Sequence, residues 1–185
     1  MYAKVKPPPL ALCMCGIGAV VGCVSPDLCD AVASAIGPRG PDLQGSRAYS
    51  PAECPGVTLL SSVLHIRTEA PFPQPVSLSL SPGSTDATSD CSPTLHGVYN
   101  GEIYTQDGAD IGQDVCDTAL VLTHLRALLT RHHPSMGDTE GWGAVARGLS
   151  SLEGPFALIV LDESTQQLIC VRDHLGRRSL THWIQ

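Results

Sequence analysis

The dipeptide Met14-Cys15 carries the most distinctive chemistry in the chain. A cysteine that follows a methionine can become the first residue of a mature protein, where it bears a thiol and a free α-amine on one residue. The thiolate is a strong nucleophile, and an α-amine with a pKa of roughly 7.7–8.0 can accept its proton near neutral pH. Thirteen residues precede Met14. We therefore expect residues 1–13 to be a leader, or an extension upstream of the true start, so that the mature protein begins with Cys15.

Other residues could complete a site around this thiol, although each is weak evidence alone. Arg67 follows a predicted strand and would ordinarily be a surface charge. Asn100-Gly101 favours a tight turn. Asp117 stands at the start of a predicted helix, where an acidic residue usually caps the helix or complements its dipole. A single cysteine is likewise more often a core residue than a catalyst.

Several short motifs occur together in one order, and this combination is more specific than any of its members. The motifs are M-C-G-I (14–17), R-G-P-D (39–42), L-H-I-R (64–67), Q-P (74–75), Y-N-G-E-I-Y (99–104), C-D-T (116–118) and R-D-H-L-G-R-R-S-L (172–180). The series resembles the glutaminase domain of class II glutamine amidotransferases, the N-terminal-nucleophile type. Within that class it is most similar to asparagine synthetase, and in particular to the asparagine synthetase domain-containing proteins. The resemblance spans Met14 to about Trp183, and one departure is Pro38, where the family usually has a histidine.

The resemblance implies a chemical role for three residues. Cys15 would attack the side-chain amide of glutamine and release ammonia. The side-chain amide of Asn100 and the backbone N–H of Gly101 would donate hydrogen bonds to the oxyanion of the tetrahedral intermediate.

The resemblance also implies residues that select glutamine. Arg67 matches the cation that grips the α-carboxylate, since a guanidinium can bind both oxygens. Asp117 matches the anion that holds the α-ammonium, and Glu102 matches the acidic position that binds the amino group or supports the loop. We expect the R-G-P-D segment (39–42) to position the loop near the cysteine or the partner domain. We expect Arg172 and Asp173 to form an internal ion pair rather than to bind the substrate directly.

The implied architecture is α+β: a four-layer αββα N-terminal-nucleophile hydrolase-like sandwich of two antiparallel sheets. Residues 14–185 would form one type-2 glutamine amidotransferase domain. Its expected function is to hydrolyse glutamine to glutamate and ammonia for an asparagine-synthetase-like amide transfer in amino-acid biosynthesis. The sequence has no S-G-G-x-D-S segment. We therefore expect no cofactor in this domain, with ATP and Mg²⁺ confined to a synthetase domain or subunit that would be its partner.

Two other interpretations stay open. In the first, the chain is a catalytically inactive amidotransferase-like module with a binding or regulatory role, because an α-amine of Cys15 held in a peptide bond is no longer a base. In the second, it is a secreted, disulfide-linked domain. This rests on the even number of cysteines, eight, and on the apolar run from Leu10 to Val24.

Composition excludes several classes of protein. Hydrophobic residues make up 43% and charged residues 16% of the chain, which is typical of a globular protein. The net charge of −7 argues against nucleic acid or an acidic membrane as a partner. No C-x-x-C pair occurs, so we expect no metal site. We expect most of the thiols to be reduced and buried, which favours a cytoplasmic protein.

The order of elements predicts α+β with antiparallel sheets. Predicted strands cover residues 17–24, 57–66, 94–99, 156–161, 168–171 and 180–184, and residues 103–104 resume the strand that ends at the Asn100-Gly101 turn. Predicted helices cover 26–36, 116–131 and 142–149. Residues 67–93 are rich in Pro, Ser and Thr, and we expect a loop there that is mobile over 81–92.

Overall fold

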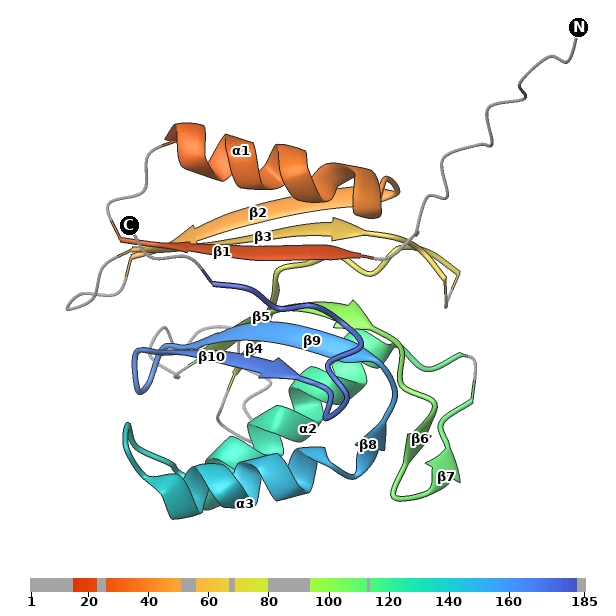
Figure 1. Ribbon diagram of the computed structural model, residues 1–185, viewed down its shortest axis with the longest axis vertical. Coiled ribbons are helices and arrows are strands. Elements are labelled where there is room, and N and C mark those ends of the chain that lie inside the picture. Colours follow the sequence, from red (N-terminus) through yellow and green to blue (C-terminus); the bar gives the residue numbers. More distant parts are fainter. Residues whose placement is uncertain are drawn as a thin grey trace, which may run out of the picture.

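The computed structural model describes residues 15–22, 26–50, 56–66, 69–79, 94–112 and 114–182. Its elements form four layers: one helix, two antiparallel sheets face to face, and a pair of helices (Figure 1). The α+β class and the layered αββα sandwich expected from the sequence are confirmed. Residues 1–13, Arg67 and the segment 81–92 lie outside the described residues.

The first sheet has the strand order β1-β3-β2, and both strand pairs are antiparallel. Its strands are β1 (Gly16–Val21), β2 (Leu43–Tyr49) and β3 (Val57–Val63). Every residue of the central strand β3 is buried. Its valines and leucines make the strand visible in the sequence, although Thr58, Ser61 and Ser62 interrupt the apolar run and are buried as well.

Helix α1 (Pro26–Ile36) covers the outer face of the first sheet, and the short 3₁₀ helix η1 (Gly37–Arg39) follows it (Figure 1). Two glycines of β1 let this helix approach closely. A Cβ atom on Gly16 would lie 2.6 Å from Cβ of Ile36, and one on Gly18 would lie 2.7 Å from Cγ1 of Val32. Alternate residues of a strand point to the same face, so both glycines lie beneath the helix and seat β1 against it. Cys15 immediately precedes this strand.

The second sheet has the order β10-β9-β5-β4. Its strands are β4 (Val76–Ser79), β5 (Thr94–Gly101), β9 (Phe156–Asp162) and β10 (Gln167–Arg172). The two sheets pack through a cluster of buried side chains, Tyr49, Val57, Leu59, Val98, Ile159 and Leu161. This cluster holds β1 and β3 over β5, and it thereby fixes the cysteine relative to the Asn100-Gly101 pair.

Helices α2 (Asp117–His132) and α3 (Thr139–Leu149) cover the other face of the second sheet (Figure 1). The buried side chains of α2 include Val121, Leu122, Leu125 and Leu129, which recur at the helical spacing seen in the sequence. They form a core with Leu158 and other residues of the sheet. Three short strands, β6 (Thr105–Gln106), β7 (Ala109–Asp110) and β8 (Leu152–Glu153), form a small third sheet.

Several expected boundaries are wrong. Asn100-Gly101 is not a tight turn: β5 continues through it, because Asn100 pairs with Ala157 and Gly101 with Phe156 in β9. Ile103 and Tyr104 do not resume a strand, although Ile103 is completely buried. Residues 180–182 form no strand; Leu180 instead packs against the cluster between the sheets. Residues 183–184 lie outside the described residues.

Candidate functional site

The Cys15 thiol lies against the end of strand β3. Its Sγ accepts a hydrogen bond from the Leu64 N–H at 3.3 Å and lies 3.7 Å from the Leu64 carbonyl oxygen, to which the thiol donates. The register places it there, since Gly16 pairs with Ser62 in antiparallel strands. A residue just before β1 therefore meets residues just after β3.

Ser62 fixes the backbone that follows the cysteine. The Gly16 N–H donates to Ser62 Oγ at 3.2 Å, and Ser62 Oγ donates to the Ile36 carbonyl at 2.6 Å. Ser62 is 1% exposed. One hydroxyl thus ties β1 and the end of α1 to β3, so the position of Cys15 is set by buried contacts.

The R-G-P-D segment holds the chain that faces Cys15. The Asp42 N–H donates to the Val63 carbonyl at 3.1 Å, and Asp42 Oδ2 accepts from the His65 N–H at 2.7 Å. Pro41 forms a parallel bridge with Val63. The segment therefore lies beside the cysteine loop, one of the two positions expected from the sequence, and fixes the residues on either side of Leu64.

The Gly101 N–H points toward the pocket side of β5. N–H groups alternate in direction along a strand. The Glu102 N–H points toward β9 and donates to the Pro155 carbonyl at 3.0 Å. The Tyr99 N–H points away from β9 and donates to Gln74 Oε1 at 2.6 Å. Gly101 is odd-numbered like Tyr99, so its N–H faces the Gln74 side. Close packing also requires glycine here, because a Cβ atom would lie 2.6 Å from Cβ of Phe156.

Asp117 occupies the first turn of α2, directly after Cys116 at the N-cap. The cap residue makes no side-chain hydrogen bond to the helix. An acidic residue in the first turn is stabilised by the helix dipole. Asp117 is 8% exposed, so this carboxylate is almost completely withdrawn from solvent next to the pocket.

A pocket of about 70 Å³ brings several of the expected residues together. Cys15, Gly101, Glu102 and Asp117 all line it, although they come from three different parts of the chain. Asn100 is 4% exposed and lies in the strand at its edge, without contributing to the lining. Arg67 is outside the described residues, and the preceding Ile66 lines the pocket. The remaining lining residues are Val63, Leu64, His65, Phe72, Gln74, Tyr99, Cys116 and Thr118.

Burial dominates the electrostatics of the pocket. It raises the pKa of the Cys15 thiol, and the Leu64 N–H and the positive charges of Arg178 and Arg39 offset this only in part. Burial also raises the pKa of Tyr99 well above its usual value, and the negative charges of Asp117, Cys15 and Glu102 raise it further. Tyr99 therefore keeps its proton, and its buried hydroxyl has no hydrogen-bond partner among the described residues.

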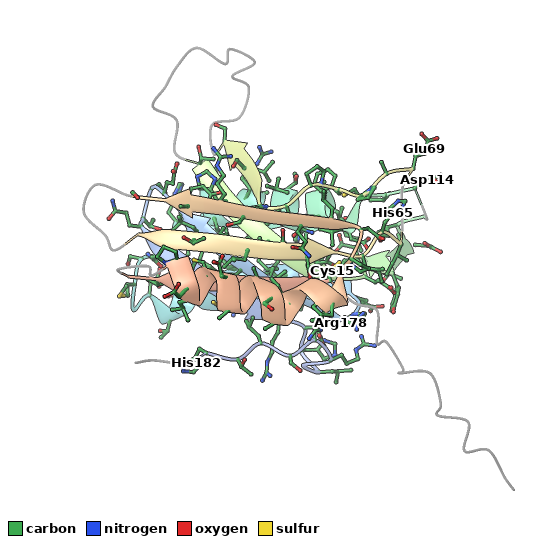
Figure 2. All side chains as sticks on the ribbon, turned by 90° about the horizontal axis from the view of Figure 1, so that it is seen from above. Cys15, His65, Glu69, Asp114, Arg178 and His182 are labelled. Carbon is green, nitrogen blue, oxygen red and sulfur yellow. The ribbon has the colours of Figure 1, made fainter. Side chains whose placement is uncertain are left out.

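The loop after β10 brings Arg178 to the same end of the molecule as Cys15 and His65 (Figure 2). Asp173, which is 3% exposed, organises this loop. Its carboxylate accepts from the N–H groups of Leu175, Arg177 and Arg178 at 3.0, 3.3 and 3.4 Å, and from that of Phe156 at 3.2 Å. The expected ion pair with Arg172 is replaced by one with Arg177, whose Nε lies 3.9 Å away.

Replacing Asp173 with alanine is expected to lower the free energy of unfolding by roughly 3 kcal/mol at pH 7, because four N–H groups lose a charged acceptor. Burial opposes ionisation of Asp173, yet the N–H donors hold its pKa below the usual value. A depressed carboxyl pKa contributes stability above the unfolded-state value of about 3.9 and loses it as the pH falls through the folded value.

The difference between wild type and Asp173→Ala, measured by urea unfolding, should therefore be largest at neutral pH and shrink below about pH 4. Asp173→Asn, which keeps one acceptor oxygen, serves as the matched variant and should lie between the two. A difference that does not depend on pH would show that the charge of Asp173 contributes nothing.

Comparison with known families identifies the domain type. A model of the glutamine amidotransferase domain matches residues 80–185, which is more than half of the chain. The chain belongs to the glutamine amidotransferase family. Searches of curated proteins and of solved structures gave no match. The glutamine amidotransferase part of the sequence-based resemblance is thus confirmed.

The matched part of this glutamine amidotransferase chain contains Asn100, Gly101, Glu102 and Asp117, whereas Cys15 and Arg67 precede it. The pocket joins Cys15 to the matched part. Sequence reasoning assigned no role to Gln74, Tyr99 or Thr118, which also line this pocket. A signal existed for all three, since Gln74, Tyr99 and Thr118 belong to the ordered motifs Q-P, Y-N-G-E-I-Y and C-D-T.

Three further observations concern only the part of the chain that the structure describes. Within it, no three or more metal-ligating side chains come together. No helix there is long and apolar enough to span a membrane. Cys15, Cys29, Cys116 and Cys170 are free thiols.

Proposed function

We propose that this domain hydrolyses glutamine to glutamate and ammonia, with Cys15 as the N-terminal nucleophile of the mature protein. The α-amine of Cys15 takes the thiol proton, and the sulfur attacks the side-chain amide carbon of glutamine. The resulting tetrahedral intermediate collapses when the C–N bond breaks and the amine returns the proton to the leaving nitrogen, releasing ammonia. Water then hydrolyses the thioester to glutamate and regenerates the thiol.

The raised pKa of Cys15 supports a need for this base. Because burial disfavours the thiolate, little of it forms near neutral pH without a neighbouring proton acceptor. The free α-amine of a first residue lies within reach of its own thiol. Removal of residues 1–14 would therefore supply the base at the same moment as it exposes the nucleophile.

The surrounding residues are assigned to the parts of the substrate. Asn100 and the Gly101 N–H stabilise the oxyanion, Arg67 binds the α-carboxylate, and Asp117 binds the α-ammonium, with Glu102 supporting the amino group or the loop. The direction of the Gly101 N–H supports its assignment to the oxyanion, and the buried position of Asp117 beside the pocket supports its assignment to the α-ammonium.

The ammonia is proposed to serve an asparagine-synthetase-like amide transfer in the cytoplasm, as the ordered motifs suggest. A synthetase domain or subunit would then be the partner and would hold ATP and Mg²⁺. The domain itself uses no cofactor in this scheme, because thiol, amine and hydrogen-bond donors complete every step.

One observation carries the proposal: a single pocket is lined by Cys15 and by residues of the region that matches the family, among them the expected site residues Gly101, Glu102 and Asp117. A different observation favours an inactive module. In the full sequence Met14 precedes Cys15, so the α-nitrogen of Cys15 is in a peptide bond unless the chain is processed.

The deciding experiment is to express the full chain, determine its N-terminus by intact mass, and measure glutamate release from glutamine on the same sample. We expect a mature chain that begins with Cys15 and hydrolyses glutamine. If every molecule retains Met14, or if the processed chain releases no glutamate, the inactive module is the correct interpretation.

A further inference from the structure

Gln74 joins two walls of the pocket that come from distant parts of the sequence. Its side chain is buried, and the residue is 6% exposed. Its Oε1 accepts a hydrogen bond from the Tyr99 N–H at 2.6 Å, while its Nε2 donates to Thr118 Oγ1 at 3.4 Å. The two ends of one amide group are thus used on different elements, one on β5 and the other in the first turn of α2.

On β5 this side chain takes the place of a strand. The pairing of β4 with β5 runs from Ser79–Thr94 to Val76–Gly97 and stops there. Tyr99 lies beyond the last pair, and its N–H is bound by the Gln74 side chain instead of by backbone. The next N–H on this side of β5 belongs to Gly101. Gln74 therefore binds the last backbone N–H on this edge of β5 before the edge faces the pocket.

At its other end the amide holds the start of α2. Thr118 follows Asp117 directly, and both line the pocket. Gln74 is itself anchored, because its backbone carbonyl accepts a hydrogen bond from Ser61 Oγ of β3 at 2.8 Å. The backbone of Gly45 also packs so closely on this carbonyl that a Cβ atom there would overlap it. A fixed residue thus spans the two walls.

We propose that Gln74 is a positioning residue that sets the separation between the oxyanion donors on β5 and the ammonium-binding end of α2. This inference rests on the proposed function, and Gln74 itself touches no reacting atom. Glutamine presents its side-chain amide and its α-ammonium at opposite ends. Because one side chain contacts both β5 and α2, it keeps the oxyanion donors and the ammonium-binding residue at a separation that suits one glutamine molecule.

Two variants separate the two hydrogen bonds. Gln74→Met keeps the length of the side chain and removes both bonds, whereas Thr118→Val keeps the shape of residue 118 and removes only the bond to α2. We expect Gln74→Met to lower kcat for glutamine by about 10–100-fold, less than complete loss of an oxyanion donor, and to raise KM. Thr118→Val should raise KM several-fold with kcat within about twofold, and Thr118→Ser should restore the wild-type KM.

The control is Gln106→Met, which makes the same substitution in β6 outside the pocket and should leave kcat and KM unchanged. Rates are referred to the concentration of folded protein, taken from the amplitude of the thermal unfolding transition of the same sample, so that loss of folded protein does not imitate an effect on kcat. A second readout needs no activity: the Tyr99 amide should exchange with deuterium at least about 10-fold faster in Gln74→Met, where its acceptor is lost, and at the wild-type rate in Thr118→Val.

The proposal is overturned by a wild-type kcat and KM in Gln74→Met, by unchanged exchange of the Tyr99 amide, or by an unchanged KM in Thr118→Val. If Gln74→Met does not fold, the KM of Thr118→Val decides. If wild type releases no glutamate, the proposed function fails, and the exchange of the Tyr99 amide still decides whether Gln74 holds β5.

Discussion

Replacing Cys15 with alanine is expected to lower kcat for glutamine hydrolysis by about 10⁴-fold or more, the largest effect of any single substitution in this chain. Without the sulfur no thioester forms, and what remains is the modest catalysis that oxyanion donors and substrate binding provide to water. Stability should change little, because the thiol is half-buried and its hydrogen bonds reach only the backbone of Leu64. The measurement is glutamate release, together with the thermal midpoint of the same sample.

Two controls make this result specific. Cys170→Ala removes an exposed thiol from β10 and should leave activity unchanged. The N-terminus of Cys15→Ala must be determined by intact mass, so that a processing defect is not mistaken for loss of the nucleophile. Activity within about tenfold of wild type in a correctly processed Cys15→Ala protein would show that another group attacks the amide, since a lost nucleophile costs far more than this.

The central strands and the edge strands β1 and β10 could be predicted from the sequence, whereas the edge strands β2 and β4 could not. β3 and β9 are buried along their whole length. In β9 this burial selects a nearly continuous apolar run, and in β3 it selects valines and leucines with small hydroxyl residues between them. β2 is exposed along most of its length and contains Gln44, Ser46 and Arg47, and β4 is four residues long. Such strands form because the neighbouring strand offers backbone hydrogen bonds. This requirement places few constraints on which amino acids the strand contains, so it is hard to recognise in the sequence.

The reading of Asn100-Gly101 as a tight turn failed for a related reason. The pair does favour turns in isolation, but here it lies at the end of β5, opposite Ala157 and Phe156. Pairing with β9 supplies the backbone partners and overrides the local preference. The chemical role assigned to these residues does not need a turn; it needs an N–H that faces the pocket, which the strand geometry provides.

The ordered motifs identified residues that line the pocket, but they did not reveal the contacts that hold these residues in place. Cys15, Gly101, Glu102 and Asp117 were grouped by resemblance, and the structure brings them to one pocket. The contacts that hold them there, such as Ser62 under Gly16, join residues far apart in sequence. A serine in an apolar strand gives no sign of which carbonyl or N–H it binds. These tertiary hydrogen bonds are set by the assembled sheets, so they could not be predicted from local pattern.

Asn100→Ala is expected to produce the second-largest effect, a fall in kcat of about 10²–10³-fold, which corresponds to roughly 3 kcal/mol in the barrier. KM for glutamine should change little, because the negative charge on the oxygen develops only as the sulfur attacks. Asn100 tests the oxyanion site more cleanly than Gly101, where any added Cβ would press on Phe156 and distort β5.

The matched variant for this test is Asn100→Asp, which nearly preserves the size of the side chain and replaces its N–H donor with a negative charge. It should be at least as slow as Asn100→Ala, because like charges repel where the oxyanion forms. Asn100 is buried, so both proteins should be assayed well below their thermal midpoints, with rates normalised to the concentration of folded protein from the amplitude of the unfolding transition. If kcat per folded molecule stays at the wild-type value while only the yield of folded protein falls, Asn100 supports the strand and does not stabilise the transition state. A loss confined to KM would place its amide on the bound substrate, because an interaction formed only in the transition state lowers kcat.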